Sequence, residues 1–304
     1  MWFSHIRLIS HFASPCRSNE GEHKLDPIVI LLLSLLGLFA GFVGGMLGVG
    51  GGVFVVPILV LAFDLEAQQA AGTSLVMVIF AALSGTAAYY RQKRIDWKVG
   101  ISAAFVTAPG AIIGAYATQL FSSKNLAIIF GVVLFLMAGA MIRRSYRTMN
   151  QSAKTVTAVR NSPKVEQGIW SRRIVDSAGK VFDYDARIYY GLALLFFGGL
   201  ASGFLGIGGG LIVVPILTAY VGLPMHVAVA TSMLTMIFTA ISGVSTHIAL
   251  GHVLVEYAIP LVIGILFGAQ FGARTANRLK SANLERIFAF MVLAMGVLLI
   301  ITRM

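Results

Sequence analysis

The sequence is poor in charge and almost devoid of cysteine. Only 12% of its 304 residues are charged, whereas soluble domains typically carry about 25%, which excludes an ordinary soluble domain. Cys16 is the single cysteine, which excludes an intramolecular disulfide. The chain is instead 58% hydrophobic, and apolar runs of about 20 residues recur along nearly its whole length. This pattern predicts an all-α polytopic membrane protein in the plasma (bacterial inner) membrane.

The net charge of +11 is distributed as in a membrane protein, not as in a nucleic-acid-binding protein. Ten Lys or Arg, against four acids, lie in the connector 143–187, and most of the others lie in short breaks between apolar runs. Basic residues at such breaks orient membrane proteins. We therefore expect the lipid bilayer as a partner and no nucleic acid. Residues 1–27 form a polar tail with scattered histidines, and no metal site or cofactor is expected.

An internal duplication organises the chain. The glycine-rich segment 41–57 recurs at 199–215 with an offset of 158 residues, and 21 of the 45 positions from Gly41 to Gly85 are identical to their partners. The register extends well beyond the glycines without a gap. The sequence therefore predicts two copies of one unit of roughly 110 residues, a first repeat at 28–142 and a second at 188–304.

Each repeat is expected to hold four long apolar segments and a short one. The long segments are 28–47, 73–90, 99–120 and 126–142, then 188–205, 231–250, 255–273 and 284–301. The short segments are 53–63 and 211–221, and each would span about 16 Å as a helix, roughly half the hydrocarbon core. This predicts 8–10 membrane segments. The polar connector 143–187 has no clear period and is expected to be a partly disordered cytoplasmic linker.

The distribution of basic residues favours inverted repeats. The connector and the basic loop 91–98 are expected on the cytoplasmic side. In the second repeat, the partner of the basic loop has no Lys or Arg, whereas the segment 274–286 holds four. Both facts fit a second repeat that is upside down relative to the first, with ten segments and both termini outside. Parallel repeats with eight spans are the alternative, which would put four basic residues outside.

Each repeat has a dense glycine break before its short segment, at 48–52 and 206–210. Dense glycine ends a helix, so the short helix begins inside the membrane with amides that lack an internal partner. These amides and the positive end of the helix dipole suit a small anion. Interrupted helices in two inverted halves are typical of secondary transporters. We expect the two helix starts to face one shared site.

The predicted substrate-binding residues are the glycines of the breaks and a hydroxyl pair on the following helix. They are Gly48, Gly50, Gly51, Gly52, Thr73 and Ser74, with their partners Gly206, Gly208, Gly209, Gly210, Thr231 and Ser232. A hydroxyl donates a hydrogen bond without adding a fixed charge, so an anion can bind and still leave. Alternatively, Thr and Ser hydroxyls inside membrane helices bond to carbonyls of their own helix. The flanking Gly41, Gly45, Gly199 and Gly203 are expected to serve helix packing.

Four polar residues are candidates for coupling or gating, because ionisable groups inside membranes are often functional. They are Gln68, His226, His247 and Arg274. Gln68 and His226 are partners under the repeat offset, and Arg274 has the alternative role of a cytoplasmic anchor.

The paired segments that end in Val-Val-Pro-Ile-Leu, each followed by Ala-x-x-Thr-Ser and then Ser-Gly, resemble the sulfite exporter TauE/SafE family of membrane permeases. The resemblance covers about residues 31–301. It implies a secondary transporter, not an enzyme, for sulfur-containing anions such as sulfite or sulfonates, and we expect alternating access with proton coupling. Segment 64–69 maps to no family motif, which leaves the coupling ion open. The alternatives are a passive anion channel and a membrane-embedded assembly factor or enzyme. The exact anion, the direction of transport and the oligomeric state stay open.

Overall fold

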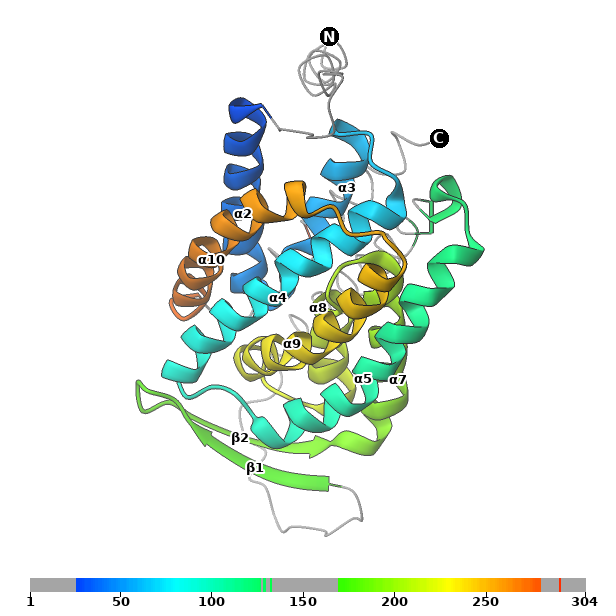
Figure 1. The fold of residues 1–304 in the computed structure, drawn as a ribbon. Coiled ribbons are helices and arrows are strands. Elements are labelled where there is room, and N and C mark those ends of the chain that lie inside the picture. Colours follow the sequence, from blue (N-terminus) through cyan, green and yellow to red (C-terminus); the bar gives the residue numbers. More distant parts are fainter. Residues whose placement is uncertain (1–25, 127, 130–131, 133–168, 280–289, 291–304) are drawn as a thin grey trace, which may run out of the picture.

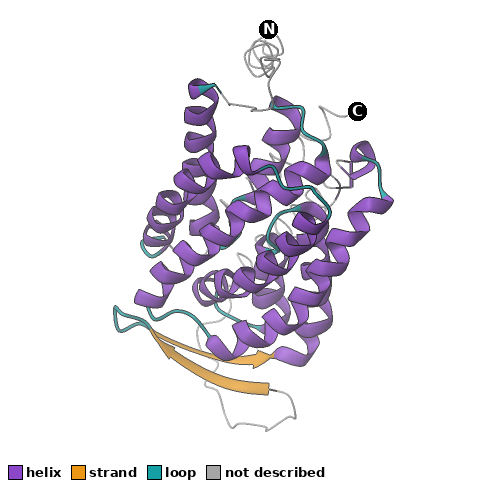
Figure 2. Ribbon diagram, in the orientation of Figure 1, coloured by secondary structure: helices purple, strands orange, loops and turns teal. Residues whose placement is uncertain are grey.

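The protein is a bundle of long helices with one β-hairpin at an end (Figures 1 and 2). The computed structural model describes residues 26–126, 128–129, 132, 169–279 and 290. Five described helices are long and apolar enough to cross a membrane. They are α2 (Pro27–Leu47), α4 (Ala67–Arg91), α5 (Trp97–Ala117, extended by the 3₁₀ turn η1, Thr118–Leu120), α9 (Met225–Ala249) and α10 (Val255–Ala276). The prediction of a helical polytopic membrane protein is confirmed.

Three shorter apolar helices lie among the long ones. They are α3 (Gly52–Ala62), α7 (Ile188–Leu205) and α8 (Gly210–Ile216), the last continued by the π-helical turn η2 (Leu217–Val221). The short segment predicted in each repeat is therefore present. Helix α4 begins before the predicted residue 73, because Glu66 and Gln69 form a capping box at its start. The predicted spans 126–142 and 284–301 lie largely outside the described residues.

The duplication is visible in how the helices pair. Helix α2 packs along α10, and its repeat partner α7 packs along α5. Both pairs depend on glycine: a Cβ at Gly45 would lie 2.7 Å from the Cα of Ala269, and one at Gly203 would run into the carbonyl of Ala111. These two contacts are the same contact under the 158-residue offset. The packing role expected for the flanking glycines is confirmed, because close backbone approach requires them to lack side chains.

The end of the connector, residues 169–187, forms a β-hairpin that the sequence analysis did not predict. Strands β1 (Ile169–Val175) and β2 (Val181–Arg187) pair antiparallel. In β2 every second side chain is buried, Phe182, Tyr184 and Ala186, and they pack on residues of α5, η2 and α9. Buried and exposed side chains alternate along β2 with a period of two, which is the sequence signal of a strand and differs from the helical period of the membrane spans.

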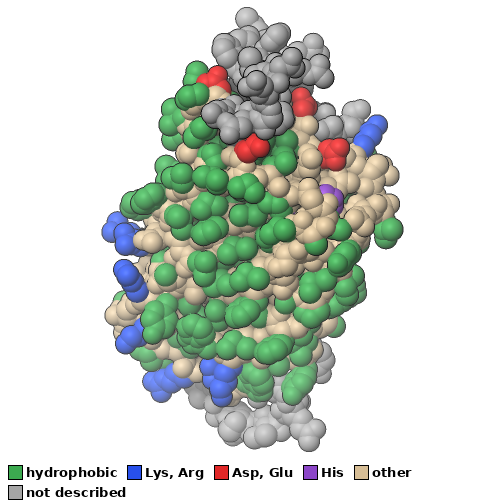
Figure 3. Space-filling model, viewed as in Figure 1, with side chains coloured by type: hydrophobic (Ala, Val, Ile, Leu, Met, Phe, Trp, Pro, Cys, Tyr) green, Lys and Arg blue, Asp and Glu red, His purple; other side chains and the backbone are tan. Residues whose placement is uncertain are grey.

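Charge separates the two ends of the bundle. The starts of α2, α4 and α10 lie opposite the hairpin (Figure 1) and carry Asp26, Glu66 and Glu256. On the face drawn in Figure 3, Lys and Arg gather toward the hairpin end, and Asp and Glu lie near the opposite end. The hairpin end also holds four acids, Asp96, Asp176, Asp183 and Asp185. Below, the hairpin end is called the basic end and the opposite end is called the acidic end. Basic residues are enriched on the cytoplasmic side of membrane proteins, which favours a cytoplasmic basic end.

Candidate functional site

The two glycine breaks meet in the centre of the bundle. Between α2 and α3, and between α7 and α8, the chain turns through loops that we call the glycine loops, residues 48–51 and 206–209. A Cβ at Gly52 would lie 2.7 Å from the carbonyl oxygen of Gly206, and one at Gly210 would lie 2.7 Å from the Cα of Val49. Each helix start therefore rests on the opposite loop. The two breaks therefore lie against each other, and a shared ligand site between them stays a prediction.

Backbone conformation explains why these positions are glycine. Gly48, Gly50 and Gly51 have φ of 76°, 77° and 85°, in the left-handed region that L side chains avoid. Their partners Gly206, Gly208 and Gly209 have φ of 74°, 74° and 82°. The same turn is therefore made twice, and each copy ends a helix in a left-handed C-cap.

The helices that follow the loops start with unpaired amides. Among the described residues, no acceptor is found for the N–H groups of Gly51, Gly52 and Val53, or for those of Gly209, Gly210 and Leu211. All six residues are buried. A buried amide without a partner is costly, and the N-terminus of a helix attracts negative charge. The arrangement suits a small anion.

The loops are closed by apolar side chains. A Cβ at either Gly50 or Gly208 would meet Val78 of α4 and Met236 of α9, which are partners under the offset. Both side chains are fully buried. Neither of the two cavities lined by the described residues at the edges of α10 includes a residue of the glycine loops. The two loops are thus in contact, and apolar side chains pack over them.

The predicted serines bind the loops across the repeats. Ser74 Oγ donates to the carbonyl of Gly206 at 2.5 Å, and Ser232 Oγ donates to that of Gly48 at 2.9 Å. Each hydroxyl also approaches a carbonyl one turn back in its own helix. Ser74 therefore holds helix α4 against the second glycine loop, and Ser232 holds helix α9 against the first.

The predicted threonines accept hydrogen bonds from loop amides. Thr73 Oγ1 accepts from the amide of Leu254 at 3.0 Å, and Thr231 Oγ1 accepts from that of Asp96 at 3.1 Å. Both threonines are fully buried. Thr73 thus stabilises the connection between α9 and α10, and Thr231 stabilises the connection between α4 and α5. In this structure the two hydroxyl oxygens bind these connections and not the glycine loops.

None of the four candidates for coupling forms a hydrogen bond to a glycine loop in the described structure. Gln68 Nε2 donates to Phe121 O, and its partner His226 binds Leu279 O through Nε2 at 3.1 Å. His247 Nε2 donates to Gly203 O at 2.9 Å, close before the second loop. Arg274 is exposed at the basic end. The structure therefore brings His247 nearest to the loops, and Gln68, His226 and Arg274 to the ends of the bundle.

Sequence reasoning missed one polar group beside the loops. Ser202 on α7 is fully buried, its Oγ has no hydrogen-bond partner in the described structure, and a Cβ at Gly209 would lie 3.5 Å from that oxygen. Its repeat partner is Gly44. A comparison of the repeats for differences, in addition to identities, could have found it. Ser202 is therefore a further donor candidate at the start of α8.

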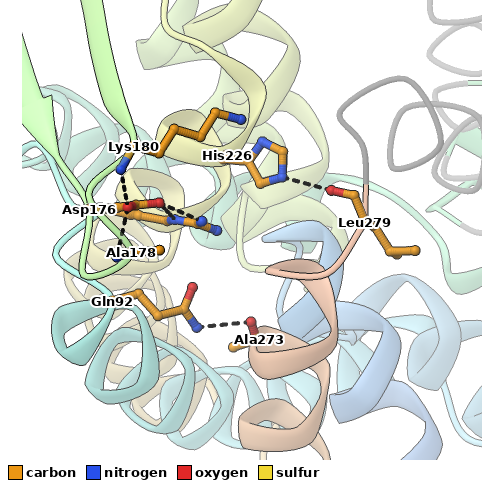
Figure 4. Close-up of polar contacts among 8 residues, drawn as sticks. Gln92, Asp176, Ala178, Lys180, His226, Ala273 and Leu279 are labelled. Carbon is orange, nitrogen blue, oxygen red and sulfur yellow. Dashed lines mark hydrogen bonds and ion pairs between the residues drawn. The ribbon is translucent and has the colours of Figure 1, made fainter.

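The hairpin clamps the basic end through two ion pairs. Arg172 binds both oxygens of Asp96 at 2.9 Å, and Tyr184 donates to the same carboxylate at 2.6 Å. Arg94 binds Asp176 in the hairpin turn at 2.7 Å. Near this turn, Gln92, His226 and Leu279 bring the ends of α4, α9 and α10 together (Figure 4).

The clamp shifts the pKa values of its members. Burial acts to raise the pKa of Asp96, but hydrogen bonds from Arg172 and Tyr184 outweigh it, so this pKa lies below its ordinary value. Burial and then the Asp96 carboxylate raise the pKa of Tyr184. The clamp is therefore ionised at Asp96 and protonated at Tyr184 at neutral pH.

These features define a polytopic membrane transport protein: a helical bundle with two interrupted helices that meet at its centre. The sequence profile of the family described as Sulfite exporter TauE/SafE matches residues 33–299. The chain belongs to this family. It is a multi-pass protein of the bacterial inner membrane, and its family is one of transporters, not enzymes.

The chain is similar to proteins named as transporters over nearly its full length. It is 34% identical over 278 residues to the probable membrane transporter protein YunE of Bacillus subtilis, which covers 89% of this chain and 97% of the relative. It is 27% identical to the probable membrane transporter protein YdhB of the same organism, with 90% and 99% covered. A probable membrane transporter protein of Xylella fastidiosa is also 27% identical, with 87% and 92% covered. No solved structure matches the chain.

Proposed function

We propose that the protein is a secondary transporter for small sulfur-containing anions, such as sulfite or sulfonates, that works by alternating access. The observation that carries the proposal is the contact between the two glycine loops, with three unpaired amides at each helix start. Backbone amides of glycine can approach a small anion closely, because no side chain lies between the N–H group and the anion. The family description adds the sulfur anion as the substrate class.

The proposal includes inverted repeats, and the ends of the helices support it. Gln68 at the start of α4 binds Phe121, just beyond α5, at the acidic end. The partner bond, from His226 at the start of α9 to Leu279 just beyond α10, lies beside Gln92 at the end of α4 (Figure 4). Helix α9 thus begins where α4 ends. Since α4 and α9 are repeat partners, this arrangement supports opposite directions across the bilayer for the two repeats.

Alternating access would act on the contact between the loops. In the closed arrangement the loops touch, and Val78 and Met236 cover them. Movement of one repeat against the other would separate the loops toward one side, and the amides would then face water and the anion. The serine bonds to Gly48 and Gly206 link each loop to the other repeat, so they would break and reform in each cycle.

Proton coupling is the finer part of the proposal. His247 is the candidate, because its Nε2 binds the carbonyl of Gly203 on the helix that leads into the second glycine loop, and its Nδ1 lies 3.1 Å from Nδ1 of His252. A change in protonation at this pair would alter a hydrogen bond next to α7. This links a proton on the acidic end to the position of one loop.

The test is flux in proteoliposomes that contain the full chain. Radiolabelled sulfite and a labelled alkanesulfonate are offered with and without a pH gradient, with empty liposomes as the control. We expect saturable flux that the gradient accelerates. Flux that neither saturates nor responds to the gradient would identify a channel, and recovery of a chemically altered compound would identify an enzyme. Flux equal to that of empty liposomes would overturn the proposal.

A further inference from the structure

A second polar site lies at the basic end, between the last turns of α4 and α10. It is a cavity of about 340 Å³ lined by six polar side chains, Arg91, Gln92, Gln270, Arg274, Asn277 and Arg278. None of these residues belongs to the glycine loops or to the hydroxyl pairs. Arg91, Arg274 and Arg278 are exposed. The cavity therefore opens to the surroundings and is separate from the central site.

The three arginines of the cavity have no carboxylate partner in the part of the chain that the structure describes. The ion pairs of that part are Arg94–Asp176, Arg172–Asp96 and Arg173–Asp183. Acidic residues are not among those that line the cavity. Three guanidinium groups around one cavity favour an anion with several oxygens, because each can donate two parallel hydrogen bonds to it.

Gln92 adds an acceptor to these donors. It is only 8% exposed, and its Nε2 donates to the carbonyl of Ala273 at 3.0 Å. Its Oε1 is buried and has no partner among the described groups. A ligand that carries a hydroxyl or ammonium hydrogen in addition to its anionic oxygens would satisfy this atom. Inorganic sulfate, which has only acceptors at neutral pH, would not.

Apolar surface leads up to the cavity on both helices. On α4, Leu83 is 46% exposed and lies two turns before Arg91 on the same helical face. On α10, Phe267 is 62% exposed and Phe271 is 53% exposed, and both precede Arg274. Each helix thus presents an apolar stripe to the lipid region that ends in arginine. This is the profile of a phospholipid, with acyl chains along the stripes and a phosphodiester among the arginines.

We propose that this cavity binds the headgroup of an anionic phospholipid that carries hydroxyl groups, such as phosphatidylglycerol, in the leaflet at the basic end. Basic pockets between membrane helices on the cytoplasmic side hold anionic headgroups in this way. The phosphodiester contacts the three arginines, and a headgroup hydroxyl donates to Gln92 Oε1. Through Gln92 and Ala273, the lipid links the ends of α4 and α10, one helix from each repeat.

The binding experiment uses the purified full chain in detergent, with native mass spectrometry of added phosphatidylglycerol and phosphatidylcholine. The test variant is Arg91→Gln with Arg274→Gln and Arg278→Gln. The matched control is Lys93→Gln with Lys98→Gln and Arg173→Gln, which removes the same charge from the same end but none of it from the cavity. We expect wild type and control to prefer phosphatidylglycerol, and the test variant to bind it about a hundredfold more weakly.

Three results would overturn the proposal. They are equal phosphatidylglycerol binding by the test and control variants, no preference of the wild type over phosphatidylcholine, and displacement of the lipid by inorganic phosphate or sulfite at low millimolar concentration. The last result would assign the cavity to a free anion.

The single variants Arg274→Gln and Arg278→Gln change exposed side chains, so they keep the test valid if the triple variant does not fold. Each should weaken phosphatidylglycerol binding severalfold. Thermal unfolding in detergent verifies folding. Binding is measured without transport, so a failure of sulfite flux and a failure of lipid binding are separate results.

Discussion

Each end of the bundle has an equivalent hydrogen bond from a loop amide to a threonine hydroxyl, but the two ends carry different side chains. At the basic end Thr231 accepts from the amide of Asp96, and at the acidic end its partner Thr73 accepts from that of Leu254. Asp96 and Leu254 are themselves partners under the offset. Only Asp96 has a carboxylate, and it holds the hairpin through Arg172. The repeated frame is therefore symmetric in its backbone, while one end alone has an ionic clamp.

A second matched position shows the same division. Tyr89 donates to the carbonyl of Gly45 at 2.8 Å, and its partner His247 donates to that of Gly203 at 2.9 Å. The Nδ1 atom of His247 also lies 3.1 Å from that of His252, whose partner under the offset is Arg94. The frame again repeats, but a pair of imidazoles stands at the acidic end where Tyr89 and Arg94 stand at the basic end. Differences between the repeats thus point to directional function more directly than their identities do.

The largest effect is expected where the repeats touch. Gly52→Ala and Gly210→Ala add a Cβ that would collide with the backbone of the opposite glycine loop, although neither position has positive φ. Transport should fall at least about tenfold, since a small displacement of binding groups is costly. The measurement is flux in proteoliposomes, normalised to folded protein.

The control for these variants is Gly251→Ala, whose φ is 72° and whose Cβ would meet nothing within 4 Å. It carries backbone strain without the collision. Loop variants that transport as well as this control would remove the glycine contact from the mechanism.

The next effect should distinguish the two ends. Asp96→Asn removes the charge that binds Arg172 and accepts from Tyr184, and it should loosen the hairpin by about 2–3 kcal/mol. Leu254→Ala at the matched position should leave the hairpin unaffected. Hydrogen exchange of β1 and β2, followed by mass spectrometry, measures the difference. Equal protection of the hairpin in both variants would mean that the clamp contributes nothing.

A smaller effect is expected from the hydrogen bond that both ends share. Thr73→Val and Thr231→Val each leave one loop amide without its acceptor, which costs about 1–2 kcal/mol. Because the two threonines are equally buried and the bonds are 3.0 and 3.1 Å long, the two variants should lower the thermal midpoint in detergent by similar amounts. If the midpoint falls for only one of the two variants, the two equivalent hydrogen bonds contribute unequally to stability.

The smallest effect is a pH dependence that differs between the ends. Burial lowers the pKa of His252 in the α9–α10 connection, although Glu66 acts to raise it. Its contribution to stability is complete above about pH 6.5 and falls as the pH drops through the lower folded pKa. The contribution of Asp96, whose pKa is also lowered, is lost only below about pH 4.

Hydrogen exchange separates these two windows. Between about pH 7 and pH 5, exchange corrected for its intrinsic rate should rise in residues 250–254 and stay constant in the hairpin. His252→Gln should abolish the first change and leave the acid transition of the hairpin intact. A simultaneous change at both ends in the wild type would contradict the assignment to separate groups.

The site was predictable where local pattern decides it. Hydropathy identified the described long helices, and glycine density located both interruptions, because glycine is the residue that adopts the left-handed turn without strain. The repeat offset then paired these features before any contact was known. It could not show that Ser74 and Ser232 bind the loop of the other repeat, since a bond across 132 or 184 residues leaves no periodic trace.

By itself, the sequence determined that this is a duplicated helical membrane protein with one broken helix in each copy, because composition and period depend only on neighbours along the chain. Tertiary structure alone decided that the two breaks rest against each other, that the hairpin packs on one end, and that Arg274 lines a cavity at that end. Those outcomes depend on which surfaces fit together in three dimensions. For the two breaks, the physical reason is that glycine has no side chain, so the backbones of the two repeats can pack in direct contact.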